Sequence, residues 1–130
     1  KEACRIIHER GACIAGVTDG ANGSYFVWPD GTFYRCEPFT QSTVVDTTGA
    51  GDSFHGAFLA NLVHTINHMK GPTTKHDRAS IHAVELLKAC AHSDLEKAAI
   101  FASAVASLNT QGIGGRSPLP TVKSVQELIG

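Results

Sequence analysis

The residues best suited to chemistry lie in one short stretch, where Gly49, Ala50 and Gly51 are followed directly by the carboxylate of Asp52. An apolar pattern with helical spacing begins at the same point. The backbone N–H groups at the start of a helix have no intrahelical partners, and they lie at the positive end of the helix dipole. Because glycine and alanine are small, an anion can approach these groups closely. The stretch therefore predicts a cradle for a phosphate or another oxyanion.

Asp52 is predicted to be ionised, because the helix dipole favours the charged form of a carboxyl group in the first turn. A carboxylate beside an anion cradle repels a bound phosphate, so its presence needs a reason. One hypothesis is a general base, which takes the proton from a hydroxyl group while a phosphoryl group is transferred in the cradle. The alternative is a tight strand-to-helix turn in which Asp52 only complements the dipole. The chemistry of these residues favours neither hypothesis over the other.

Other motifs in the chain are weaker. The sequence contains no G-x-x-x-x-G-K-[ST] motif, and the glycine spacing in GAGDSFHG argues against a dinucleotide-dependent oxidoreductase. His64 and His68 could share a metal on one helical face, but no H-E-x-x-H pattern accompanies them, and we interpret them as surface histidines. No C-x-x-C pair occurs, so free and buried thiols are expected at Cys4, Cys13, Cys36 and Cys90.

Hydrophobic spacing and turn signals predict the elements that position the cradle. Helices are predicted over 1–11, 51–69, 78–91, 94–108 and 121–129. Apolar and β-rich runs predict a buried strand within 12–20, a hairpin over 24–37 and a short strand at Val44–Val45. Loops are predicted over 71–75 and 111–120. This order indicates an α/β architecture with an antiparallel β-hairpin excursion.

Length and composition indicate a single soluble domain. The chain has 130 residues, of which 42% are hydrophobic and 18% are charged, with a formal net charge of −1. This charge gives no electrostatic reason to expect nucleic acid or an anionic membrane as a partner. No apolar run approaches the ~20 residues needed to span a bilayer, and no signal peptide opens the sequence. We therefore expect a cytoplasmic protein.

Three segments together resemble the ribokinase (PfkB) family of carbohydrate and nucleoside kinases. Residues 46–59, DTTGAGDSFHGAFL, meet every constrained position of the family's C-terminal signature. Residues 18–23, TDGANG, are similar to its T-x-G-x-x-G segment, which borders the ATP phosphates. Residues 99–120 resemble its Ala-rich helix and the glycine-containing loop that follows. The resemblance covers nearly the whole chain and implies a ribokinase-like fold with Rossmann-like α/β/α layers, of which the C-terminal portion is present.

The resemblance implies specific roles for the residues of the cradle. Asp52 would be the catalytic base, and the amides of Gly49, Ala50 and Gly51 would form the anion hole for the γ-phosphoryl group of ATP. Mg²⁺ would bridge phosphate oxygens. Phe101 falls beside the adenine position, where it would stack on the base or serve as a core phenylalanine. The nucleotide site implied in this way comprises Thr18, Asp19, Gly20, Ala21, Asn22, Gly23, Gly51, Asp52 and Phe101.

A monovalent cation such as K⁺ is a further implication of the resemblance. Asp46 and Thr48 match positions that hold such a cation in family members that use one. The 111–120 loop is one residue longer than usual, so the choice between Arg116 and Ser117 stays open. The implied ligands are Asp46, Thr48, Ser107, Thr110, Gly112 and Ser117.

Family members are more than twice as long as this chain, and their N-terminal half supplies the sugar-contacting residues and a lid. Residues 1–130 are therefore expected to be the C-terminal, nucleotide-binding part of a sugar kinase, inactive without that half. The alternative is a non-catalytic nucleotide-binding or anion-binding regulatory module. Residues 67–93 are expected to add a solvated helix or a subunit contact, and the oligomeric state, a homodimer included, stays open.

Overall fold

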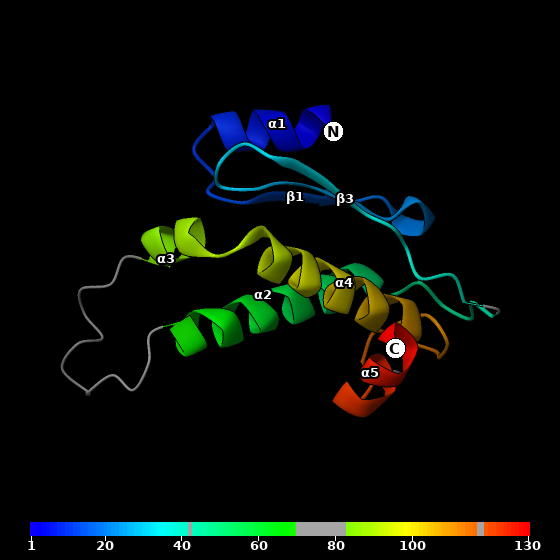
Figure 1. The fold of residues 1–130 in the computed structure, drawn as a ribbon. Coiled ribbons are helices and arrows are strands. Elements are labelled where there is room, and N and C mark those ends of the chain that lie inside the picture. Colours follow the sequence, from blue (N-terminus) through cyan, green and yellow to red (C-terminus); the bar gives the residue numbers. More distant parts are fainter. Residues whose placement is uncertain (42, 70–82, 117–118) are drawn as a thin grey trace.

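The computed structural model describes residues 1–41, 43–69, 83–116 and 119–130. Two layers of helices enclose a small sheet (Figure 1). The helices and strands are α1 (Glu2–Glu9), β1 (Ala15–Thr18), the 3₁₀ turn η1 (Gly20–Asn22), β2 (Ser24–Val27), β3 (Phe33–Cys36), α2 (Ala50–Met69), α3 (Ala83–Ala89), α4 (His92–Asn109) and α5 (Val122–Ile129). The predicted loop over 71–75 and the start of the predicted helix over 78–91 lie outside the described residues.

The sheet is antiparallel, with the strand order β1-β2-β3. The predicted hairpin is confirmed, because β2 pairs with β3 in a register that places Val27 opposite Phe33. The Asp30 carboxylate closes the turn by accepting the backbone N–H of Thr32 at 2.9 Å. The strand predicted within 12–20 is confirmed as β1, but the prediction that it is buried was wrong. β1 lies at the edge of the sheet, and of its residues only Ala15 is buried.

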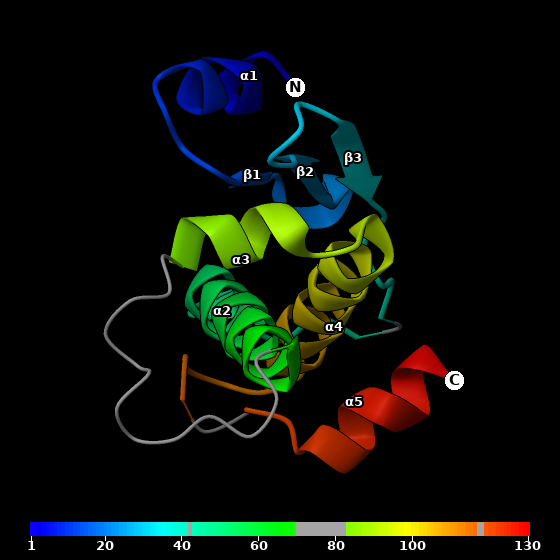
Figure 2. The same ribbon diagram turned by 60° about the vertical axis from the view of Figure 1, so that its left-hand side comes forward.

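The main core lies between the sheet and the pair of long helices α2 and α4. The rings of Phe26 and Phe58 stack with their centroids 5.1 Å apart, and Phe26 and Trp28 stack at 4.9 Å. Ala98 and Ala102 of α4 are fully buried in the same cluster. Their small side chains let α2 and α4 lie side by side, as both views show (Figures 1 and 2). Helix α1 covers the opposite face of the sheet, where Cys4 packs with Ala15 and Val27.

Residues 44 and 45 do not form the predicted strand. The Val44 and Val45 side chains are 60% and 50% exposed. The backbone N–H groups of Val45 and Asp46 both donate to the carbonyl oxygen of Thr110, at 2.8 and 3.2 Å. Two consecutive donors on one acceptor tie a loop to the end of α4 and are not a strand ladder. The β-branched pair suggested a strand, but tertiary contacts decide its conformation.

The predicted free thiols are confirmed. All four cysteines are unpaired, and Cys4, Cys36 and Cys90 are buried whereas Cys13 is partly exposed. The predicted surface histidines lie on the exposed side of α2, with the Nε2 atoms of His64 and His68 2.9 Å apart. Within the described residues, no helix has the length and hydropathy required to cross a membrane.

Candidate active site

A tight turn delivers the chain into the N-terminus of α2. The Ala50 N–H donates to the Thr47 carbonyl oxygen at 3.2 Å, and Gly49 has a φ of +78°. Every described residue with a positive φ is a glycine, so Thr48 has a negative φ. A β-turn with a positive φ at its third residue alone is of type II, and glycine is the residue that this position favours.

A second constraint on Gly49 is its contact with the loop after α4. A Cβ atom at this position would lie well inside van der Waals distance of the Gly115 Cα and 3.0 Å from the Gly115 carbonyl oxygen. Gly49 therefore permits both the shape of the turn and the close approach of two loops.

The amides predicted to bind an anion are partly free. The Ala50 N–H is used within the turn, as described above. For the N–H groups of Gly49, Gly51 and Asp52, the described part of the chain offers no hydrogen-bond partner. The Asp52 side chain is exposed in the first turn of α2. Free donors at a helix N-terminus form a site where an anion can bind, and the exposed Asp52 carboxylate follows them directly in the sequence.

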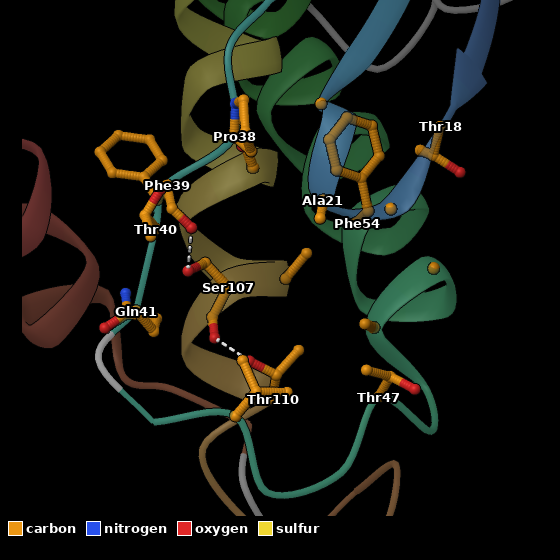
Figure 3. Close-up of a pocket in the computed structure, with 17 residues that line it drawn as sticks. Thr18, Ala21, Pro38, Phe39, Thr40, Gln41, Thr47, Phe54, Ser107 and Thr110 are labelled. Atoms are coloured by element: carbon orange, nitrogen blue, oxygen red, sulfur yellow. Dashed lines mark hydrogen bonds between the residues drawn. The ribbon is translucent and has the colours of Figure 1, made fainter.

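Of these residues, Gly51 lines a cavity of about 450 Å³, whereas Gly49 and Asp52 are not among its lining residues. Its walls come from the β1–β2 turn, the segment after β3, the start of α2 and one face of α4 (Figure 3). Thr47, Ala50 and Gly51 line the α2 side, and Ser107 and Thr110 line the α4 side. The lining is mostly apolar, with polar groups concentrated on α4 and on the turns, which is the usual character of a small-molecule site.

The predicted nucleotide segment 18–23 forms the wall of this cavity between β1 and β2. Thr18, Gly20, Ala21 and Gly23 line the cavity. Asp19 and Asn22 are used within the turn itself, because the Asn22 Nδ2 donates to the Asp19 carboxylate at 3.2 Å. The segment after β3 was not identified from the sequence. The cavity residues missed there are Pro38, Phe39, Thr40, Gln41 and Val44.

Comparison with known proteins identifies the family. The sequence model of the pfkB carbohydrate kinases matches residues 1–122, which is most of the chain. The chain belongs to the pfkB family. It is 28% identical over 125 residues to a bifunctional ribokinase/ribose-5-phosphate isomerase A from Fructilactobacillus sanfranciscensis, a match that covers 96% of the chain and 18% of that relative.

Solved structures of pfkB-type kinases share the fold. The chain resembles an Arabidopsis thaliana ribokinase complexed with ribose and ATP, with a TM-score of 0.65 and 27% identity over 95% of the chain and 31% of that protein. A double-mutant fructokinase from Vibrio cholerae with bound fructose, ADP and potassium gives a TM-score of 0.71 at 19% identity, over 99% of the chain and 34% of that protein. The ribokinase-like fold is therefore confirmed. The chain spans 18% to 34% of the length of these three relatives.

Phe101, which the pfkB resemblance suggested for the adenine site, is not among the residues that line the cavity. It packs with Phe39 and Leu108 against the cluster that joins α4 to Val125 of α5. Phe101 is partly buried, and the choice between base stacking and a core role stays a prediction. The residues of α4 and its C-cap that do line the cavity are Ser103, Ala106, Ser107 and Thr110.

The residues suggested for a monovalent cation lie where two loops meet. The Asp46 carboxylate accepts the N–H groups of Thr48 and Gly114, each at 2.9 Å, and these two bonds hold its pKa below the usual value. The Thr110 hydroxyl donates to the Ser107 carbonyl oxygen at 2.7 Å, and the Ser107 hydroxyl donates to that of Phe39 at 2.8 Å.

The side chains of Asp46, Ser107 and Thr110 offer oxygen atoms as ligands, which a hard cation prefers. Each of these side chains already takes part in a hydrogen bond within the chain. Gly112 lines a second hollow between the end of α4 and α5, together with Pro120 and Ser124. Ser117 lies outside the described residues. The cation site therefore stays a prediction.

Proposed function

We propose that the complete gene product is an ATP-dependent kinase that transfers the γ-phosphoryl group to a hydroxyl group of a sugar or a related small molecule. The observation that carries this proposal is the start of α2. There, the N–H groups of Gly49 and Gly51 lack partners within the described chain, and the exposed Asp52 carboxylate follows directly. Membership of the pfkB family and the ATP- and ADP-bound relatives support the same activity.

The cavity suits the nucleotide. Its end between Gly20, Ala21 and Gly51 has small residues, so phosphate oxygens can approach backbone N–H groups there. The walls farther from α2 are formed by the 38–41 segment and by the α4 face, and they would hold the base and the ribose. Mg²⁺ would supply positive charge that neutralises the phosphates, and because the described residues include no group of three or more His, Cys, Asp or Glu side chains that could hold a metal, its ligands would come mainly from the nucleotide and water.

Asp52 would act on the acceptor. An ionised carboxylate that can reach the acceptor hydroxyl takes its proton as the oxygen attacks the γ-phosphorus. The amides of the turn meanwhile stabilise the charge that develops on the transferred phosphoryl group. The acceptor would be bound by further sequence, since this chain spans only 18% to 34% of the relatives named above. We therefore propose that residues 1–130 alone lack sugar kinase activity and are the nucleotide-binding part.

The test is ATP consumption by the complete gene product against a panel of sugars and nucleosides, with Asp52→Asn as the first variant. Loss of a general base is expected to lower kcat by at least ~10²-fold. Asp94→Asn is the matched control, because Asp94 also lies in the first turn of a long helix, away from the cavity. Both substitutions remove an acid that complements a helix dipole, but only Asp52→Asn should affect turnover.

Two results would count against the proposal. Near-normal turnover in Asp52→Asn would remove the carboxylate from the mechanism. Nucleotide binding by the wild-type protein without phosphoryl transfer to any acceptor would favour a non-catalytic binding module.

A further inference from the structure

The central peptide of the turn before α2, between Thr48 and Gly49, can in principle take two orientations. Type I and type II turns have similar ends, but they differ by a rotation of about 180° of this peptide unit. In the type II form seen here, the Thr48 carbonyl and the Gly49 N–H point in opposite directions, because the peptide is trans and planar. Whatever holds the Thr48 carbonyl therefore also aims the Gly49 N–H.

The group that holds this carbonyl is the side chain of Asn109. The Asn109 Nδ2 donates to the Thr48 carbonyl oxygen at 3.3 Å, across 61 positions of sequence. Asn109 is the last residue of α4 and is 0% exposed. Because Asn109 is part of α4, its hydrogen bond fixes the position of the turn relative to this helix. Helix α4 forms the opposite wall of the cavity.

Other hydrogen bonds hold the segment that leads into the turn, and most of them join it to the loop after α4. The Asp46 carboxylate accepts the N–H groups of Thr48 and Gly114, and the Thr110 carbonyl accepts those of Val45 and Asp46. Within the described residues, the Asn109 amide is the hydrogen-bond donor to the central carbonyl. Removing it would leave the flanks of the turn in place and free the central peptide to rotate.

Stability of the fold does not by itself explain an asparagine at position 109. Its Oδ1 is buried and has no hydrogen-bond partner in the described part of the chain, and an unsatisfied buried polar atom opposes folding. Thr48 is an exposed residue, so water could satisfy its carbonyl without Asn109. A leucine of similar shape would remove the unsatisfied oxygen and keep the packing. The presence of asparagine at this position is better explained by its effect on the orientation of the Thr48–Gly49 peptide.

We propose that Asn109 is a positioning residue for phosphoryl transfer, which holds the Thr48–Gly49 peptide so that the Gly49 N–H faces the transferred phosphate. This inference rests on the proposed function, since it assumes that the turn receives a phosphate. Asn109 itself acts through the Thr48 carbonyl and is not required to touch the substrate.

The experiment compares the wild-type complete gene product with Asn109→Leu and with Leu95→Ala. Leu95 is 1% exposed near the other end of α4 and away from the cavity, so Leu95→Ala controls for a general loss of stability. Affinity for ATP and for adenosine is measured by titration, with kcat and thermal unfolding alongside. The affinity for adenosine depends only on the cavity walls that would hold the base and the ribose. The affinity for ATP depends in addition on the turn, because ATP carries the phosphates.

Asn109→Leu is expected to leave the unfolding temperature and the adenosine affinity unchanged or slightly raised. ATP affinity, kcat or both should fall about 3- to 10-fold, the effect of one lost hydrogen bond. Unchanged ATP affinity and kcat would overturn the inference, and so would parallel losses for ATP and adenosine like those of Leu95→Ala. Should Asn109→Leu not fold, Asn109→Ser, whose hydroxyl is too short to reach the carbonyl, is judged by the same comparison.

The two proposals can fail separately. If the wild-type protein transfers phosphate and Asn109→Leu matches it in every measurement, only the role of Asn109 is refuted. If the wild-type protein binds ATP without transferring phosphate, and Asn109→Leu selectively weakens ATP, the kinase assignment is refuted and the orienting role stands.

Discussion

Replacing Gly49 with alanine is expected to destabilise the protein by about 2–5 kcal/mol, from two additive causes. The first is conformational, because Gly49 has a φ of +78° and an L-residue in that region costs about 1–2 kcal/mol. The second is steric, because the new Cβ would press on the Gly115 Cα and lie 3.0 Å from the Gly115 carbonyl oxygen. Backbone atoms cannot turn aside as a side chain can, and overpacking of this kind costs about 1–3 kcal/mol.

Two other glycines separate these causes. Gly31 in the hairpin turn has a φ of +86°, and among the described residues no atom lies within 4 Å of the place that a Cβ would take. Gly31→Ala should therefore show the conformational cost alone, about 1–2 kcal/mol. Gly56 lies inside α2, also with open space around it, so Gly56→Ala should stabilise the protein by about 0.5–1 kcal/mol. Glycine-to-alanine substitution is thus expected to lower the free energy of unfolding most at Gly49, to lower it less at Gly31, and to raise it at Gly56.

The assay is urea denaturation of the complete gene product, followed by far-UV circular dichroism, with each free energy of unfolding compared with the wild-type value. The contact between Gly49 and Gly115 would be refuted if Gly49→Ala and Gly31→Ala lost the same amount. The conformation of the turn itself would be refuted if Gly49→Ala remained within about 0.5 kcal/mol of the wild type, the range typical of neutral surface changes.

Two further predictions concern the same site. Ala106→Leu adds side-chain volume to the α4 wall of the cavity and should weaken ATP binding at least ~10-fold in a titration, whereas equal affinity would place the nucleotide elsewhere. The Asp46 pKa is lowered by the N–H groups of Thr48 and Gly114, so its stabilising effect is present above the unfolded-state pKa and is lost as the pH falls through the folded-state value. The stability difference between wild type and Asp46→Asn should therefore be constant from about pH 5 to 8 and shrink below about pH 4, and a difference that grows in acid would contradict the observed bonding.

Local signals in the sequence determined much of this protein. The β-rich runs within 24–37 predicted the hairpin, and the apolar spacing predicted a helix over 51–69, where α2 begins at Ala50. These features depend on a few neighbouring residues, whose permitted φ values and hydrogen bonds are set within the segment itself. The family signature, equally local, indicated the fold that the comparisons confirm.

Only the tertiary structure decided how these segments meet. Val44 and Val45 have the composition of a strand, yet the Thr110 carbonyl holds this segment as a loop. Phe101 could stack on a base or pack in the core by its residue type alone, and its contact with the cluster around Val125 of α5 appears only in the fold. Asn109 carried no signal in the sequence, because its partner at Thr48 lies 61 residues away and meets it only after α2 packs on α4. Contacts so distant in sequence depend on how the two helices pack, which no local pattern of residue types specifies.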